Sequence, residues 1–167
     1  MNIRLAIKND LSELKYLFKE VVDDLNNVKK INMLWDNIYP FCELEKDIER
    51  QEMYVIEEEN KILGSFVLSN YDDPEYHVIE WASDNKRWFY LNRLVILPTK
   101  QGKGYAKQAM QFIFQYSIDN NYETIRLTVH KDNLYAINLY EKYGFIKVKN
   151  GYWTLDNEIF YGFEKNI

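Results

Sequence analysis

Hydrophobic and polar residues alternate along the chain with two different periods, which predict strands and helices in a definite order. Apolar residues at every second position predict strands, whereas apolar residues spaced three or four apart predict helices buried on one side. Strands are expected at residues 3–7, 53–56, 62–68, 78–81, 88–97, 125–129, 145–148 and 158–163. Helices are expected at residues 11–25, after Pro40 as far as about residue 50, and at 106–117 and 134–143.

Particular residues mark where these elements begin and end. Asp10 followed by Glu13 resembles a capping box, in which side chains satisfy the first amides of a helix. Pro40 suits the first turn of a helix, and Gly144 suits the position just after one. The order of elements predicts an α+β protein. Its central sheet should be mostly antiparallel, and parallel only around the strand–helix–strand unit near residues 88–129.

Composition limits the classes of protein that the chain can belong to. Its 167 residues, 47% of them apolar, fit a single domain spanning residues 1–167. The one cysteine, Cys42, and two histidines without ligand spacing predict no metal site and no acyl-cysteine chemistry. No apolar run is long enough to cross a membrane and no signal peptide is visible, so we expect a cytoplasmic protein without a membrane partner. A net charge of −5 argues against nucleic acid and favours a neutral or cationic partner. A homodimer is left open.

The segment from residue 94 to residue 106 carries the strongest chemical signal. A strand that ends at Pro98 leads through a loop containing Gly102 and Gly104 into an amphipathic helix. The first amides of a helix lack internal partners and carry partial positive charge, and glycines let a ligand approach the backbone closely. Such a turn is suited to a phosphate or diphosphate, although a purely structural loop with solvated lysines would look the same. The Walker A and Gly-x-Gly-x-x-Gly spacings are both absent.

Two signatures in register resemble the GNAT superfamily of N-acetyltransferases. Gln101, Gly104 and Ala106 fit its acyl-CoA pattern, Gln/Arg-x-x-Gly-x-Gly/Ala. The next strand and helix resemble its second signature through Leu127-Thr128-Val129, Asn133, Tyr140 and Gly144-Phe145. The resemblance covers residues 90–148. It implies a GNAT-like acyl-CoA N-acyltransferase fold, a three-layer α/β/α sandwich around a mixed, mostly antiparallel sheet.

The resemblance implies roles for individual residues. Asn133 would hydrogen-bond the pantetheine arm of CoA, although asparagine is also a common helix N-cap. Tyr140 would protonate the departing CoA thiolate, unless it only packs on a helix face. The backbone of the preceding strand would pair with pantetheine, and the amides of the loop would bind the diphosphate. The residues concerned are Leu94, Val95 and Ile96 in the strand and Gln101, Gly102, Lys103, Gly104, Tyr105 and Ala106 in the loop.

The general base is not identified by the sequence. A protonated amine cannot attack a thioester, so a base or water must take its proton. In ribosomal-protein N-acetyltransferases a carboxylate sits within the Leu-x-Val strand, but this chain has Thr128 there, which cannot act as a base. Glu80, Asp84 and His130 are candidates because they lie near ends of predicted strands, and none of them is singled out.

Together these features predict an enzyme that moves the acetyl group of acetyl-CoA to a primary amine by direct attack in a ternary complex. The acidic charge favours a small cationic acceptor such as a polyamine, amino acid or aminoglycoside. A protein N-acetyltransferase and a non-catalytic acyl-CoA-binding or regulatory domain on the same fold remain alternatives. The aromatic residues Trp81, Trp88, Phe89 and Tyr90 are expected either to wall the acceptor site or to fill a small core.

Overall fold

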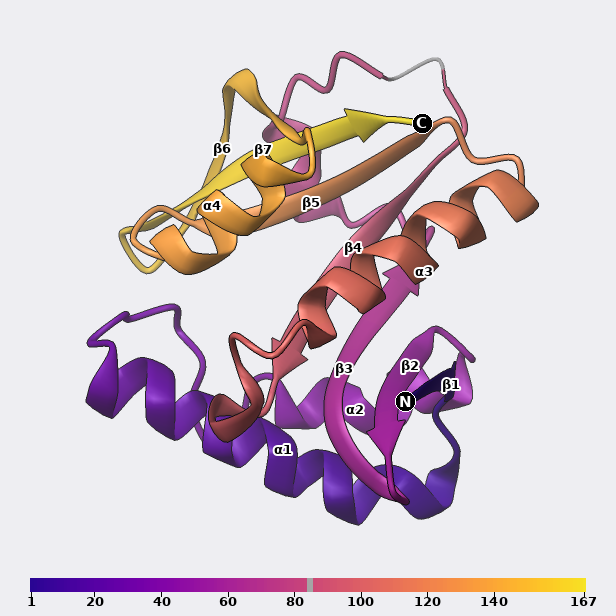
Figure 1. The fold of residues 1–167 in the computed structure, drawn as a ribbon. Coiled ribbons are helices and arrows are strands. Elements are labelled where there is room, and N and C mark those ends of the chain that lie inside the picture. Colours follow the sequence, from indigo (N-terminus) through magenta and orange to yellow (C-terminus); the bar gives the residue numbers. More distant parts are fainter. Residues whose placement is uncertain (84–85) are drawn as a thin grey trace. The chain divides into compact units, whose positions relative to one another are not determined.

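A computed structural model describes residues 1–83 and 86–167, and the chain divides into two compact units (Figure 1). Unit 1 comprises Met1–Leu68 and Asn92–Phe112, and unit 2 comprises Ser69–Leu91 and Ile113–Ile167. Two elements contribute one half to each unit, the strand β4 (Trp88–Ile96) and the helix α3 (Tyr105–Asp119). The described residues form seven strands and four α-helices, so the fold is α+β as predicted.

Unit 1 is built on antiparallel strands covered by two helices. Its strands occur in the order β1-β2-β3 followed by the second half of β4, and β1 and β3 both pair antiparallel with β2. Helices α1 and α2 lie next to one another and bury apolar side chains against these strands. The bounds are β1 (Asn2–Leu5), α1 (Leu11–Asp23), α2 (Phe41–Glu49), β2 (Met53–Glu58) and β3 (Lys61–Ser69). Its fully buried side chains include Leu14, Leu17, Phe18, Leu44, Val55 and Val67.

The turn between β2 and β3 explains why these two strands form a hairpin. Glu59 and Asn60 both adopt positive φ angles, 52° and 59°. Two consecutive residues with positive φ are typical of a tight hairpin turn whose twist matches that of the strands. The strands predicted at residues 53–56 and 62–68 are therefore confirmed, and they form an antiparallel hairpin.

The start of α1 differs from the prediction. Asp10 ends a short 3₁₀ turn (Lys8–Asp10), and its carboxylate accepts the amide of Ile7 at 2.8 Å and pairs with Arg4 at 2.7 Å. Glu13 instead accepts the amide of Ile62 from the β2–β3 hairpin at 2.7 Å. The predicted capping box is wrong because both carboxylates find partners from other elements, which the local pattern does not reveal.

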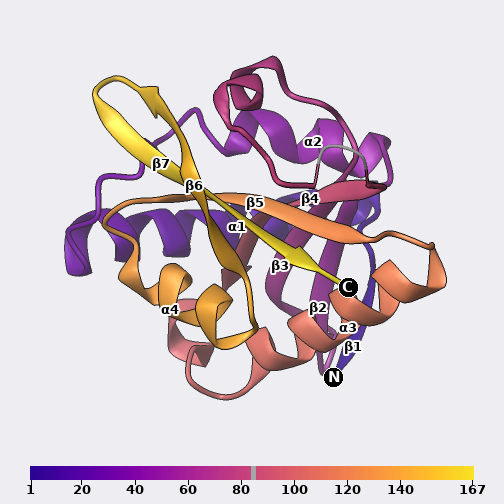
Figure 2. The ribbon, with the colours of Figure 1, turned by 90° about the horizontal axis from the view of Figure 1, so that it is seen from above.

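Unit 2 contains the parallel part of the fold. The first half of β4 pairs parallel with β5 (Thr124–His130), which matches Trp88 to Thr124 and Tyr90 to Arg126. β5 pairs antiparallel with β7 (Glu158–Asn166), and β7 pairs antiparallel with β6 (Ile146–Leu155). Within this unit α4 (Leu134–Lys142) lies on one side of β5, and the 3₁₀ helix η3 (Pro74–Val78) lies on the other (Figures 1 and 2).

The strand predicted at residues 78–81 is absent from the structure. Asp73 caps η3 by accepting the amide of Glu75 at 3.0 Å, and Pro74 occupies the first turn. Proline at this position has the φ angle that a helical turn requires, and the Asp73 side chain satisfies the first free amide. Ile79 and Trp81 are buried, as their apolar character suggested, but within an irregular segment. In the described ranges 1–83 and 86–167 no helix is long and apolar enough to cross a bilayer.

Candidate active site

The residues that the sequence singled out fall in both units. The stretch from Leu94 to Ala106 belongs to unit 1, whereas Asn133 and Tyr140 belong to unit 2. The last residues of β4 are largely buried, with Val95 at 4% and Ile96 at 8% exposure. Their side chains are therefore core, and only their backbone groups remain for a ligand.

The loop between β4 and α3 presents backbone amides at the start of a long helix. After a 3₁₀ turn at Pro98–Lys100, the amide of Gln101 bonds to the Pro98 carbonyl at 3.2 Å. The first bond of the regular helical ladder runs from the Gln108 amide to the Gly104 carbonyl at 3.1 Å. The amides of residues 105–107 therefore precede the ladder and carry the positive end of the helix dipole.

The two glycines of this loop are required by its conformation. Gly102 has a φ of +74° and Gly104 a φ of +92°, a region that residues with a Cβ rarely adopt. A Cβ built at either position would meet no heavy atom within 4 Å. The backbone of the loop thus borders open space, and an anion can reach its amides.

The side chain of Gln101 holds the loop against two other parts of unit 1. Its amide nitrogen donates to the carbonyl oxygen of Ile96 at 3.1 Å, and its amide oxygen accepts from Lys29 Nζ at 3.0 Å. Lys29 is itself paired with Asp24 at 2.5 Å. The Ile96 carbonyl, expected from the resemblance to face pantetheine, therefore already has one side-chain donor.

A backbone distortion interrupts β4 immediately before Leu94. Arg93 adopts a φ of 49° inside the strand, a left-handed conformation that is unfavourable for residues with a Cβ. Its guanidinium donates to Asp47 Oδ2 at 2.6 Å and to the Tyr39 hydroxyl at 3.2 Å. Asp47 is only 1% exposed, so a buried ion pair holds this distorted residue in place.

In unit 2, Asn133 links the end of β5 to the start of α4. Its side-chain oxygen accepts the amide of Ala136 at 3.2 Å, which confirms that it is the N-cap of α4. The predicted bond to pantetheine stays a prediction, since one side chain at a helix start can cap the helix and face a ligand.

Tyr140 lies within α4, about two turns after Asn133, and is 7% exposed. Its ring contacts that of Phe145, with the two centroids 5.5 Å apart. Burial raises the pKa of the Tyr140 phenol above its ordinary value because the phenolate would be desolvated. Tyr140 therefore stays protonated over a wide pH range, as a proton donor must.

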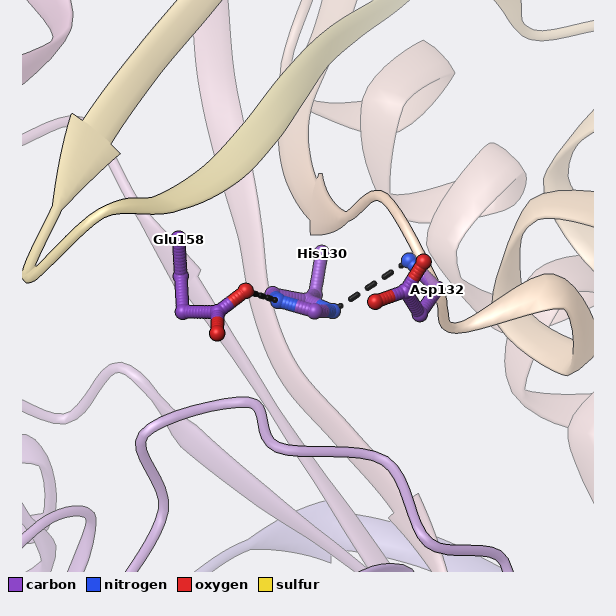
Figure 3. Close-up of side chains that lie close together, drawn as sticks. All are labelled: His130, Asp132 and Glu158. Carbon is purple, nitrogen blue, oxygen red and sulfur yellow. Dashed lines mark hydrogen bonds and ion pairs between the residues drawn. The ribbon is translucent and has the colours of Figure 1, made fainter.

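His130 does not have a free nitrogen with which to act as a base (Figure 3). The ring is fully buried, its Nδ1 accepts the amide of Asp132 at 3.2 Å, and its Nε2 lies 2.8 Å from Glu158 Oε2. Because Nδ1 is an acceptor, the proton of the neutral ring is on Nε2 and is donated to Glu158. His130 thus ties the β5–α4 turn to the start of β7.

Glu158 and Asp132 complete a cluster around His130. The three side chains offer ligand atoms within 4.8 Å of one another, a grouping that could hold a metal ion. Lys131 Nζ pairs with Asp132 at 2.5 Å and with Glu158 at 3.7 Å, so an ammonium group already balances the two carboxylates. The hydrogen bond from His130 lowers the pKa of Glu158, which stays ionised.

The other residues considered for proton or acyl transfer offer no positioned base among the described residues. Glu80 is exposed, and Asp84 lies outside the described residues. Thr128, at the position where the resembled enzymes carry a carboxylate, donates its hydroxyl to the Tyr76 oxygen at 3.4 Å. Cys42 is exposed and lies 3.7 Å from Glu43 Oε1, a neighbour that would not activate it.

The aromatic residues expected near an acceptor site fill a small core. Trp81, Phe89 and Tyr90 are buried. The guanidinium of Arg126 lies between two indole rings, 4.9 Å from that of Trp81 and 4.7 Å from that of Trp88. These contacts stabilise the irregular segment of unit 2 and leave Trp88 half-buried. Phe89 packs separately, with its ring centroid 4.9 Å from that of Tyr122.

Three residues near the site were missed by the sequence interpretation. Each of the three forms a hydrogen bond with a residue that is distant in the sequence. Lys29 bonds to Gln101, 72 residues away, and Arg93 bonds to Asp47, 46 residues away. Glu158 bonds to His130, 28 residues away. Charged residues in helices and strands are usually solvated, and no local pattern separates these three from the others. A non-glycine bulge in β4 likewise leaves no mark in the hydrophobic pattern.

Comparisons with known proteins identify the family and the fold of this chain. The sequence model of the Acetyltransferase (GNAT) family matches residues 14–145, whereas no curated protein matches the sequence. A GNAT family acetyltransferase from Streptococcus agalactiae 2603 aligns with a TM-score of 0.83 and 20% identity, covering 99% of this chain and 95% of its own. One from Listeria monocytogenes 4b F2365 aligns with a TM-score of 0.79 and 19% identity, covering 99% and 94%.

A ribosomal-protein-alanine N-acetyltransferase from Brucella melitensis aligns over all of both chains with a TM-score of 0.65 and 16% identity. At these identities the three structures share the fold with this chain. The family model spans well over half of the sequence, including both signatures, β4, the glycine loop, Asn133 and Tyr140. This chain belongs to the acetyltransferase (GNAT) family.

Proposed function

We propose that this chain transfers the acetyl group of acetyl-CoA to a primary amine, and that both units serve one catalytic domain. The observation that carries the proposal is the loop from Gln101 to Ala106. Its amides precede the helical ladder, and its glycines leave the backbone open to an anion. Membership of the acetyltransferase family supports acetyl-CoA as the donor of the acyl group.

In the proposed reaction the nitrogen of a neutral amine attacks the thioester carbonyl, so that a C–N bond forms and the C–S bond breaks. The amine gives up its proton to water or a base, and CoA leaves as a thiolate. Tyr140 donates its phenolic proton to the sulfur and then regains a proton from solvent, which balances the proton that the amine released. Backbone amides beside the distorted residue Arg93 stabilise the charge on the carbonyl oxygen. Tyr140 remains available for this step because burial keeps it protonated.

The acceptor proposed is a small cationic amine, because the protein carries a net charge of −5. A non-catalytic acyl-CoA-binding domain is the second candidate, and two observations favour it. Thr128 replaces the carboxylate of the resembled ribosomal enzymes, and both ring nitrogens of His130 are engaged. Such a domain would bind CoA at the same loop without turning over any amine.

The test is to incubate the purified full chain with acetyl-CoA and a panel of amines and to measure release of the CoA thiol. Acetylated product, identified by mass spectrometry, would support the enzyme. Tight CoA binding in calorimetry without turnover of any amine would support the second candidate. Absence of both CoA binding and turnover would overturn the assignment of the loop.

A further inference from the structure

A groove in unit 2 lies between η3 and the β6–β7 hairpin, and it is not part of the predicted cofactor site. It has a volume of about 630 Å³ and is lined by Glu75 and Val78 from η3 and by Tyr152, Trp153 and Leu155 from β6, among others. Val78 is 63% exposed, Tyr152 51% and Leu155 42%. Large apolar side chains are thus left in contact with water along the groove.

Trp153 gives the groove a fixed aromatic surface. Its indole stacks on Phe160 with the centroids 4.6 Å apart and the planes inclined by 19°. The ring of Tyr76 lies 5.8 Å from Trp153 on another side. An indole held on two sides is a rigid platform for an apolar group or for a cation above its face.

Glu75 is the single charged residue that lines this groove within the part of the chain that the structure describes. Its backbone amide is fixed by Asp73, whereas no cation among the described residues pairs with its carboxylate. Burial, together with the nearby charge of Asp73, raises the pKa of Glu75. Because Glu75 is exposed and has no cation paired with it among the described residues, its carboxylate can attract a cation that enters the groove from solvent.

The groove also reaches the strand on which the chemistry is proposed. Tyr76 contacts Trp153 with its ring and accepts a hydrogen bond from Thr128 Oγ1 at 3.4 Å with its oxygen. Thr128 lies on β5, between the first signature and Asn133, at the position of the carboxylate in the resembled enzymes. One residue therefore connects the groove to the strand where an acceptor nitrogen would be needed.

The charge of Glu75 decides which part of an acceptor the groove can hold. The attacking amine must lose its proton, whereas a carboxylate stabilises the protonated form of an amine beside it. The group at Glu75 is therefore a second positive group, which stays charged throughout the reaction. A hydrocarbon spacer suits the segment between the two nitrogens, because Val78, Tyr152, Trp153 and Leu155 line most of the rest of the groove, beside the polar residues Asn150 and Thr154.

We infer that this groove binds the non-reacting end of a diamine, with its ammonium on Glu75 and its hydrocarbon spacer along Tyr152 and Trp153. This inference rests on the proposed acetyltransferase function and names its substrate class. Two amines of equal length, 1,5-diaminopentane and 1-aminohexane, differ in that a methyl group replaces the second ammonium, and they isolate the contribution of Glu75.

The test compares both amines with the wild-type protein, Glu75→Gln and Tyr152→Ala. The wild-type protein should acetylate the diamine with a kcat/KM about tenfold above that of the monoamine, as expected for one charged contact. Glu75→Gln should remove this preference by raising the KM of the diamine alone, and Tyr152→Ala should raise the KM of both amines. Asp119→Asn, an exposed acid at the end of α3, is the control and should change neither value.

Direct calorimetry with the diamine separates failure of this inference from failure of the proposed function. Diamine binding that weakens in Glu75→Gln, without any turnover, would support the groove and overturn the proposed enzyme. Equal kcat/KM for the two amines in the wild-type protein, or an equal loss for both in Glu75→Gln, would overturn the inference alone. It would also be overturned by a dimer in solution that Tyr152→Ala dissociates, because a second copy would then cover the groove.

Discussion

Lys29 Nζ lies 3.0 Å from Gln101 Oε1, so a lysine just after α1 holds the first residue of the proposed diphosphate loop. The same ammonium pairs with Asp24, and the side chain of Lys29 is only 14% exposed. Gln101 in turn donates to the Ile96 carbonyl. The position of the loop therefore depends on a residue from a distant part of the sequence, and this dependence can be measured.

Lys29→Met is expected to raise the KM for acetyl-CoA about five- to tenfold with little change in kcat, since one hydrogen bond to a charged group is lost. Lys30→Met is the matched control, because Lys30 is exposed and its loss changes the net charge equally. Steady-state kinetics with varied acetyl-CoA would check both variants. An equal KM increase in the two variants would point to general electrostatics instead of the contact with Gln101.

Gly104→Glu and Gly104→Lys introduce the same backbone strain with opposite charges. Both side chains must adopt a φ near +92°, which costs about 1–2 kcal/mol. Only the glutamate repels a diphosphate at the helix start, so we expect calorimetry to show CoA affinity at least about tenfold weaker in Gly104→Glu than in Gly104→Lys. Equal affinities in the two variants would place the diphosphate elsewhere.

Tyr140→Phe is expected to lower kcat by on the order of 100-fold while leaving acetyl-CoA binding nearly unchanged, because the phenol acts only when sulfur leaves. Since burial raises the pKa of Tyr140, any fall in rate up to about pH 10 arises from other groups, and the variant should keep the same alkaline limb. Tyr143→Phe, on the next turn beside Phe114, is the control. A wild-type kcat in Tyr140→Phe would remove this residue from the mechanism.

Asp10→Asn is expected to destabilise the protein by about 2 kcal/mol at neutral pH, the usual size for a hydrogen bond to a charged group. Hydrogen bonding to Arg4 lowers the pKa of Asp10 in the native state, so the unfolded chain binds a proton first as the pH falls. The stabilisation is therefore present above about pH 4 and is lost as the pH drops through the native pKa of Asp10.

Urea unfolding of the wild-type protein and Asp10→Asn at about pH 7 and about pH 3 would check this expectation. The difference in unfolding free energy should shrink at the lower pH. Asp23→Asn removes a half-exposed carboxylate paired with Lys19 and should have little effect at either pH. A constant difference across the range would show that Asp10 stabilises the fold without its charge.

The strands and helices with strong periodicity were predictable from the sequence because their patterns are local. Helix α3 and strand β5, for example, have apolar spacings that nothing nearby overrides. The strand predicted at residues 78–81 was wrong, because Pro74 and the cap from Asp73 form a 3₁₀ helix that extends to Val78. The glycine loop was predictable because positive φ angles require glycine, and glycine is visible in a sequence.

Parts of the site that depend on tertiary contacts were not predictable. Both ring nitrogens of His130 are hydrogen-bonded, one to Glu158 and one to the amide of Asp132. Its place at a strand end had suggested a free base. The groove at Glu75 combines η3 with β6, two elements separated by most of unit 2 in the sequence. Neither arrangement follows from residue types or spacing alone.

Arg93 keeps a left-handed conformation in the middle of β4 while its guanidinium neutralises the buried carboxylate of Asp47. Glycine would adopt this backbone conformation freely, but it would leave Asp47 buried without a cation, which costs about 3–5 kcal/mol. A single substitution of Arg93 by glycine therefore removes the backbone strain but destabilises the protein at Asp47. Descendants that exchange Arg93 for glycine must also exchange Asp47 for an uncharged residue, so two positions 46 residues apart are expected to evolve together.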